Sequence, residues 1–184
     1  MASINSTEFR RILGHYPTGV CAITAVFETM PVGMVVGSFT SASLDPPLVA
    51  FLPDQKSTSW PKIRAAGRFC VNVLAENQEF VCRALSSKAQ NKFEAVPYRL
   101  SGAGVPIIDG CLAWVDCDLY SVYEAGDHFV ALGRINMRAK GFSPERYSLD
   151  SGGRSYGYST SALTIASDPS NLRCLREIAA CAPP

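Results

Sequence analysis

Two long stretches in the second half of the chain alternate between apolar and polar residues, and this alternation constrains the fold more than any other feature. They run from Leu112 to Glu124 and from His128 to Lys140, separated by a turn sequence at 125–127. Successive side chains of a strand point to opposite faces, so each stretch is expected to bury one face. We predict a half-buried antiparallel hairpin with Asp116 and Asp118 on its polar face.

Shorter apolar runs predict a mainly β chain around this hairpin. An earlier hairpin is expected from Val20–Phe27 and Val32–Phe39 with its turn at Pro31, and further strands are expected at Leu48–Leu52 and Arg68–Leu74. Short helices are expected around Phe9, between Ser57 and Gly67, and from Glu76 to Leu85. Because strands and helices do not alternate regularly, the sequence favours an antiparallel barrel, closed or half closed, with a few flanking helices.

Length and charge narrow the class of protein. The 184 residues suit one domain, expected over 1–160, followed by a tail at 161–184 in which Leu172, Leu175 and Ile178 have helical spacing. Seventeen basic and sixteen acidic residues leave a net charge of +1, so no nucleic-acid partner is expected. No apolar run approaches the roughly 20 residues that span a bilayer, and no signal peptide is recognisable, so we expect a cytoplasmic protein without membrane association.

The seven cysteines are expected to be reduced, and those at Cys21, Cys70 and Cys117 to be buried in strands. No metal site is predicted, because the chain has no C-x-x-C pair and only two histidines. The G-x-S-x-G match at 153–157 lacks the preceding strand and the downstream histidine of a serine hydrolase. Gly102-x-Gly104 lacks a third glycine, so we expect a turn rather than a dinucleotide-binding loop.

The segment Gly33–Pro47, GMVVGSFTSASLDPP, combines glycine with a run of hydroxyl side chains. Glycine lets a ligand approach the main chain, and Ser and Thr hydroxyls donate to phosphate oxygens. Lys56-Ser57-Thr58 adds a cation and an expected helix start, which favours anions. The pattern predicts a phosphate-bearing ligand along a strand edge. It also suits a serine-rich loop that only turns and caps a helix, and the residues alone leave that alternative open.

His128 begins the second long strand, directly after Gly126-Asp127. An imidazole there can bind a substrate phosphate or carboxamide, or transfer protons near neutral pH. It can equally be a strand-edge histidine that is bonded to Asp127. Both interpretations stay open at this point.

Motifs along residues 9–156 resemble the flavin reductase-like family with the FMN-binding split barrel, the reductase components of two-component flavin monooxygenases. The most specific are Ser38–Leu48 and Gly126-Asp127-His128, in this order and spacing. The others are Phe9-Arg10, YPTGV at 16–20, Lys56-Ser57-Thr58, Phe69–Leu74, Lys92-Phe93, and Gly152-Gly153 with Tyr156.

The resemblance implies an antiparallel split β-barrel that forms a homodimer with one flavin per subunit. It implies an NAD(P)H:flavin oxidoreductase that reduces FMN or FAD with NADH or NADPH and supplies reduced flavin to a separate monooxygenase. His128 would position the nicotinamide rather than act as an essential acid. The flavin-binding residues that the resemblance implies are Val35, Val36, Gly37, Ser38, Ser41, Ala42, Ser43, Gln55, Lys56, Ser57, Thr58, Lys92, Phe93 and Tyr156.

One departure concerns Val35-Val36-Gly37, where the family often has polar residues, so we expect main-chain contacts there. Two alternatives accompany the resemblance: a non-enzymatic flavin carrier or sensor of the same fold, and a haem- or deazaflavin-binding relative. The choices between FMN and FAD, and between NADH and NADPH, stay open.

Overall fold

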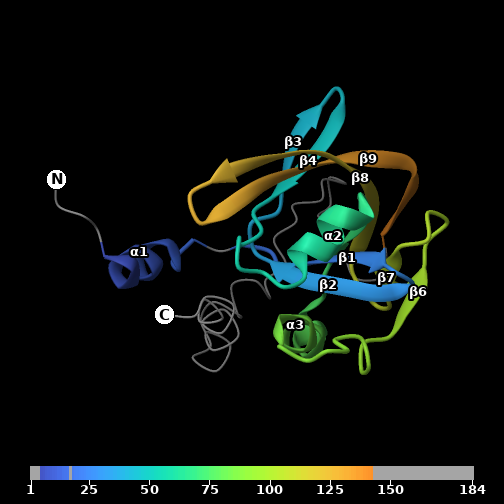
Figure 1. The fold of residues 1–184 in the computed structure, drawn as a ribbon, viewed down its shortest axis with the longest axis horizontal. Coiled ribbons are helices and arrows are strands. Elements are labelled where there is room, and N and C mark those ends of the chain that lie inside the picture. The colour runs from blue at the N-terminus through green and yellow to red at the C-terminus, as the bar shows by residue number, and fades with distance from the viewer. Residues whose placement is uncertain (1–4, 17, 143–184) are drawn as a thin grey trace, which may run out of the picture.

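The computed structural model describes residues 5–16 and 18–142, which form a curved antiparallel sheet flanked by three α-helices (Figure 1). The helices are α1 (Ser6–Leu13), α2 (Trp60–Ala66) and α3 (Glu79–Ser86), with a 3-10 turn η1 (Glu76–Gln78) before α3. The strands are β1 (Cys21–Phe27), β2 (Met30–Val36), β3 (Thr40–Leu44), β4 (Pro47–Phe51), β5 (Arg68–Val73), β6 (Tyr98–Leu100), β7 (Pro106–Ile108), β8 (Ala113–Ala125) and β9 (His128–Phe142). The G-x-S-x-G match, Tyr156 and the expected tail helix lie outside the described residues.

Seven strands form one sheet in the order β2-β1-β5-β8-β9-β4-β3, and β6 and β7 form a separate hairpin. The pairings are antiparallel throughout, which confirms the expected mainly β, antiparallel class. Gly104, with a φ of +79°, lies between β6 and β7, so the glycine pair there forms the expected turn.

The large sheet curls around one apolar core. Phe51 in β4 and Phe69 in β5 are separated by two strands, which would place them about 14 Å apart in a flat sheet. Their rings instead pack edge to face with centroids 5.3 Å apart, and Trp60 of α2 packs on Phe51 at 5.7 Å. Six strands and α2 therefore contribute to a single buried cluster.

The long hairpin of β8 and β9 is confirmed, and its pairing ends at Ala125 and His128. Register shifts between Val115 and Cys117, and between Leu119 and Ser121, interrupt the alternation of β8. Asp116 is consequently fully buried beside Cys117, so the expectation that it lies on a polar face is wrong. The segment after β6 covers it, and the Ser101 hydroxyl donates to Oδ2 of Asp116 at 2.5 Å.

The early hairpin of β1 and β2 is also confirmed, but the expectation that it turns at Pro31 is wrong. The turn lies at Glu28-Thr29, whose φ angles of 49° and 72° suit a tight two-residue connection. Pro31 lies within β2, opposite Val26. Since β2 is an edge strand, proline is tolerated there when its missing N–H would face outward.

The helices cover different parts of the sheet (Figure 1). α3 packs through Val81 and Leu85 on a second cluster that includes Ala22 and Val35, on the face of the β1–β2 hairpin opposite to α2. α1 projects away from the sheet, and Phe9 and Leu13 on its apolar side are 51% and 53% exposed.

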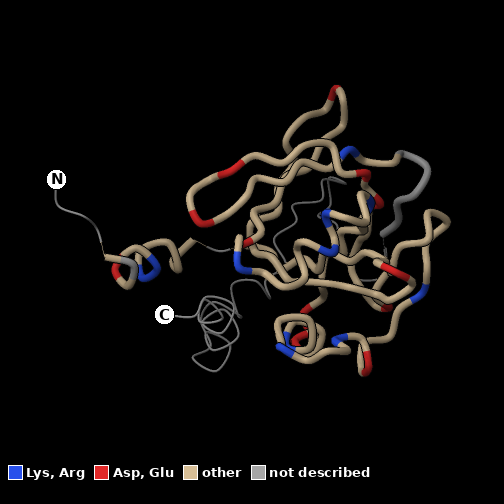
Figure 2. The backbone as a smooth tube through the Cα atoms, viewed as in Figure 1, with Lys and Arg blue, Asp and Glu red and all other residues tan. Residues whose placement is uncertain are grey.

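Basic and acidic residues intermingle along the described backbone without a continuous stripe of either sign (Figure 2). Within the same ranges, none of the helices has both the length and the hydropathy needed to cross a membrane. The cysteines of these ranges are free and buried, as expected for Cys21, Cys70 and Cys117. Burial raises the pKa of Cys21 and Cys117 to about 12, so these thiols are inert.

Candidate functional site

The turn between β8 and β9 is held by the loop that follows β4. The main-chain N–H of Gln55 donates to the carbonyl of Asp127 at 3.0 Å, and its side-chain amide donates to the carbonyl of Gly126 at 3.0 Å. The N–H of Phe129 donates to the carbonyl of Pro53 at 2.9 Å, and Asp54 forms an isolated β-bridge with His128. The structure thus brings together two motifs that lie about seventy residues apart in the sequence.

His128 lies at the edge of this turn, with its side chain 40% exposed. Its Nδ1 atom lies 2.7 Å from Oδ1 of Asp127, the geometry of the neighbour-bonded histidine considered from the sequence. This hydrogen bond with His128, and to a lesser degree the charge of Lys56, hold the pKa of Asp127 below its usual range. The bond orients the ring, and among the described residues Nε2 has no hydrogen-bond partner.

Lys56, Ser57 and Thr58 occupy the connection from this loop to α2. The N–H of Lys56 donates to Oδ1 of Asp54 at 2.7 Å, which shapes the turn, and the Lys56 and Thr58 side chains are exposed. Ser57 accepts from the N–H of Trp60 at 3.2 Å, so its hydroxyl caps α2. The helix start itself offers few donors, because the N–H of Trp60 is taken and Pro61 has none. A phosphate here would depend on Lys56 and the hydroxyls.

The end of β2 approaches the same loop through Ser38. Its hydroxyl accepts from the N–H of Leu52 at 2.9 Å and lies 3.5 Å from the Leu52 carbonyl, so it fastens β2 to the end of β4. Val35 and Val36 are buried in two different clusters, and their side chains are not available to a ligand. A Cβ on Gly37 would lie 3.0 Å from Oγ1 of Thr18, so glycine lets the chain at Thr18 pass close by.

Ser41, Ala42 and Ser43 lie on β3, at the free edge of the sheet. The register with β4 shifts between Ser41 and Ser43, which leaves Ala42 as the extra residue of a β-bulge. Ser41 and Ala42 are exposed and Ser43 is half-buried. The polar segment expected from the sequence is therefore an edge strand that presents hydroxyls to solvent.

Lys92 and Phe93, adjacent in sequence, go to different places. The Lys92 ammonium donates to Oγ of Ser59 at 3.1 Å and to the carbonyl of Leu85 at 2.9 Å, which places it at the start of α2. Phe93 is 5% exposed, and its ring lies in the α3 cluster. The structure thus joins Lys92 to the candidate site and directs Phe93 into the core.

An open groove beside this loop was not found from the sequence. It has a volume of about 470 Å³ and is lined by Gln55, Trp60, Pro61, Arg64, Ala65 and Phe129. The guanidinium carbon of Arg64 lies 5.9 Å from the centroid of the Phe129 ring. In the sequence, only the position of Arg64 one helical turn after Trp60 points to this groove, and its contact with Phe129 depends on the tertiary fold.

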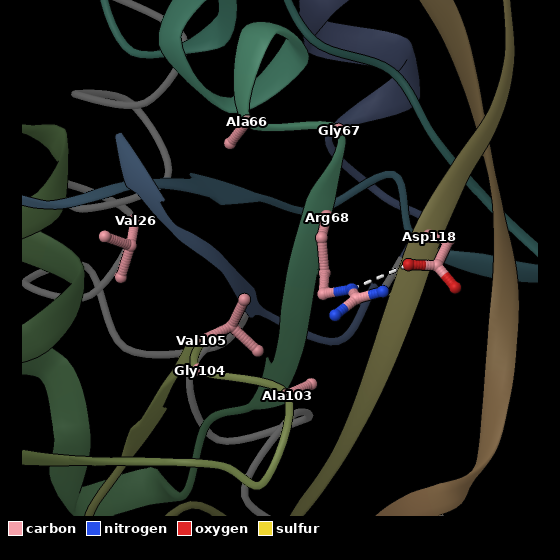
Figure 3. A pocket seen from close by; sticks show the side chains of 8 residues that line it. All are labelled: Val26, Ala66, Gly67, Arg68, Ala103, Gly104, Val105 and Asp118. Atoms are coloured by element: carbon pink, nitrogen blue, oxygen red, sulfur yellow. Dashed lines mark hydrogen bonds and ion pairs between the residues drawn. The ribbon is translucent and has the colours of Figure 1, made fainter. Parts of the chain in front are cut away.

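A second hollow, of about 350 Å³, lies elsewhere on the molecule (Figure 3). Gly67, Gly104 and Val105 are among its lining residues, and Nε of Arg68 is bonded to Oδ1 of Asp118 at 2.7 Å on its wall. None of the expected site residues lines it. The Arg68 guanidinium is already paired there, so the hollow offers less free charge than the loop at Lys56.

The candidate site therefore consists of an exposed cation, several hydroxyls and an oriented imidazole, supplied by the β2 end, the 52–58 loop and the β8–β9 turn. Such groups bind and orient an anionic ligand. In the part of the chain that the structure describes, none of them forms a nucleophile–base pair. A reaction here would draw its chemistry from a bound cofactor.

Comparison with known proteins identifies the family. Residues 13–140 match the family model described as "Flavin reductase like domain". The chain belongs to the flavin reductase-like family. A Pseudomonas putida "Flavin reductase" is 58% identical over 135 residues, which are 73% of this chain and 79% of that protein.

Two further flavin reductase-like proteins extend the comparison. The "Flavin-dependent monooxygenase, reductase subunit HsaB" of Mycobacterium tuberculosis is 47% identical, over 73% of this chain and 72% of that protein. The structure of Streptomyces globisporus "NADH:FAD oxidoreductase SgcE6 in complex with NAD and FAD fragments" is similar with a TM-score of 0.72 and 33% identity, covering 83% of this chain and 94% of that one.

The residues present fit the cofactor of this family. A flavin carries at least one phosphate, and Lys56 with the hydroxyls of Ser57 and Thr58 offers a cation and donors for it. The exposed hydroxyls of β3 suit a polyhydroxyl chain. Tyr156, also expected at the flavin, lies outside the described residues.

Proposed function

We propose that this chain is a reductase that reduces flavin with a nicotinamide dinucleotide and releases the reduced flavin to a separate monooxygenase. The observation that carries the proposal is the set of hydrogen bonds between residues 53–55 and the β8–β9 turn. Through these bonds Lys56 lies near Asp127-His128. Lys56, Ser57 and Thr58 then form a cradle for a phosphate, and the adjoining imidazole of His128 is available to a second ligand. The names of the related proteins support the same activity.

In this proposal Lys56, Ser57 and Thr58 hold the flavin phosphate. The hydroxyls of β3 and the main chain at 35–38 line the ribityl chain and the edge of the ring. Lys92 braces the start of α2 through Ser59 and so keeps the cradle in position. The bound flavin supplies the redox chemistry by accepting a hydride from the reduced nicotinamide.

His128 positions the nicotinamide in this proposal. Asp127 fixes the ring through Nδ1, which leaves Nε2 to meet a carboxamide or phosphate of the dinucleotide. Since the hydride passes between the two bound ligands, the imidazole has no proton to transfer in that step.

The proposal also covers the assembly. The curled but unclosed sheet supports a split barrel, and the exposed apolar side of α1 supports a homodimer in which α1 packs on the second subunit. Free, buried thiols support a reducing compartment such as the cytoplasm. The family match at 13–140 supports a flavin reductase domain within 1–160.

The direct test is an anaerobic reaction of the purified chain with flavin and NADH. We expect the visible absorption of the flavin to bleach much faster than in a protein-free mixture. A carrier or sensor would bind the flavin without bleaching it, and either that result or a haem spectrum would refute the proposal.

The role of His128 is tested by His128→Ala. We expect a raised KM for the nicotinamide with unchanged flavin affinity, because the imidazole contacts only the dinucleotide in this arrangement. His128→Asn, which keeps a hydrogen-bonding group, is expected to restore part of the loss. Lost flavin binding with an unchanged KM would contradict the assignment.

A further inference from the structure

We propose that the groove between α2 and the start of β9 binds the adenosine half of FAD, so that this chain prefers FAD to FMN. The inference rests on the proposed function, since it begins from a flavin phosphate held at Lys56–Thr58. It adds a specificity determinant, Arg64, that lies outside the residues expected to bind the flavin.

The first support is that the groove is continuous with the proposed phosphate position. Gln55 and Trp60 both line the groove, and they flank Lys56–Ser59 in the chain. The proposed phosphate position therefore lies at the rim of the groove. FMN ends at that phosphate, whereas FAD continues from it with a second phosphate and adenosine. The volume of about 470 Å³ is within the range of small-molecule sites, which is roughly 300–1,000 Å³.

The second support is the chemistry of the lining. The Arg64 guanidinium is exposed and lies over the half-buried Phe129 ring, with 5.9 Å between its carbon and the ring centroid. Nucleobases stack on aromatic rings and on guanidinium planes. Arg64 takes part in none of the ion pairs found between described residues, so its charge remains available to a second phosphate.

The third support is the rigidity of the walls. Trp60 belongs to the buried core, where it packs edge to face on Phe51, and Phe129 packs against this core with its ring centroid 6.2 Å from that of Trp60. Gln55 is fixed by its two bonds to the β8–β9 turn. A groove that is formed before the ligand arrives loses less ordering entropy on binding.

The test is to titrate FAD and FMN, by flavin fluorescence, into the full chain and three variants of α2. The wild-type chain is expected to bind FAD at least tenfold more tightly than FMN. Arg64→Ala is expected to weaken FAD binding roughly tenfold, the scale of one base-stacking contact, and FMN binding by less than about twofold. Arg64→Lys keeps the positive charge and loses the planar guanidinium. Its FAD affinity is expected to lie between those of the wild-type chain and Arg64→Ala.

Lys62→Ala is the matched control, because Lys62 is an exposed cation on the same helix that does not line the groove. It is expected to leave both affinities unchanged. Equal affinities of the wild-type chain for FAD and FMN, or equal losses of both in Arg64→Ala, would overturn the inference while leaving flavin reduction intact. If Arg64→Ala raised the KM for NADH and left the FAD affinity unchanged, the groove would be assigned to the nicotinamide dinucleotide, and the inference would also be overturned. Absence of binding of either flavin would refute the proposed function itself.

Discussion

Lys56 is the residue on which the proposed phosphate cradle depends most. The start of α2 offers few free N–H donors, so the positive charge must come from side chains. We predict that Lys56→Ala weakens the binding of both FMN and FAD tenfold or more, since a charge-assisted hydrogen bond contributes about 1.5–3 kcal/mol. Fluorescence titration measures this. Lys56→Arg should retain most of the affinity, and an unchanged Kd in Lys56→Ala would place the phosphate elsewhere.

Asp116 is a fully buried carboxyl group far from this cradle in the chain. Desolvation raises its pKa, although the hydrogen bond from Ser101 opposes the shift. The unfolded chain therefore releases this proton at a lower pH than the folded chain does. The stability that this group contributes is present below the ordinary carboxyl pKa and is lost as pH rises through the raised one.

We predict that Asp116→Asn removes this loss, because an amide stays neutral and its oxygen still accepts from Ser101. The Tm of the variant minus the Tm of the wild-type chain should increase as pH rises above the ordinary carboxyl pKa of about 4. Asp118→Asn is the control, since Asp118 is half exposed and pairs with Arg68. The prediction would be contradicted if the Tm of Asp116→Asn minus that of the wild-type chain stayed constant with pH or decreased as pH rises.

At the scale of elements, β9 depends on a glycine where it crosses the core. A Cβ on Gly133 would overlap the ring of Phe69 and lie 3.1 Å from Cβ of Cys117. Gly133→Ala is therefore expected to lower the free energy of unfolding by about 1–3 kcal/mol, as overpacking does. Gly102→Ala is the control, because nothing lies within 4 Å of its Cβ position. Chemical denaturation measures the free energy of unfolding of both variants. If Gly133→Ala were as stable as Gly102→Ala, the core around Gly133 would be less tightly packed than the structure shows.

The sequence predicted those elements whose signals are local. The β8–β9 alternation and the stop of α2 at Gly67, which has a φ of 69°, needed only neighbouring residues. The burial of Asp116 could not be predicted, because it depends on a register shift and on a hairpin from elsewhere in the chain. The turn at Glu28-Thr29 was missed since Pro31 is the stronger local turn signal, and only the edge position of β2 makes it acceptable in a strand.

The same distinction separates the parts of the site. Lys56–Thr58 and Asp127-His128 were selected from their own residue types, and the fold places them together. The groove at Arg64 and Phe129 joins a helix to a strand that begins more than sixty residues later, so no local pattern marks it. The burial of Phe93 likewise depends on its packing against Gly33 and Leu85, which the sequence does not pair.

At the scale of the whole molecule, the half-exposed apolar side of α1 supports assembly with a second copy. Phe9 and Leu13 are about half exposed on a helix that projects from the sheet (Figure 1). We predict that the double variant Phe9→Ser, Leu13→Ser shifts the chain from dimer toward monomer, because each buried side chain of this size contributes about 1.5–3 kcal/mol. Light scattering during gel filtration measures the mass.

Phe80→Ser is the control for this assembly, since Phe80 is another half-exposed aromatic residue, on α3. It should leave the dimer intact. A wild-type chain that is monomeric at micromolar concentration, or a dimer that withstands the double change in α1, would contradict the proposed role of this helix.

In our proposal, a flavin phosphate lies at the loop joining β4 to α2, next to the β8–β9 turn. A crystal structure of the chain with FAD tests it most directly. We expect phosphate density within hydrogen-bonding distance of Lys56 and the hydroxyls of Ser57 or Thr58, with the flavin ring extending toward His128. Flavin density in the hollow beside Arg68 and Asp118 instead (Figure 3) would contradict it.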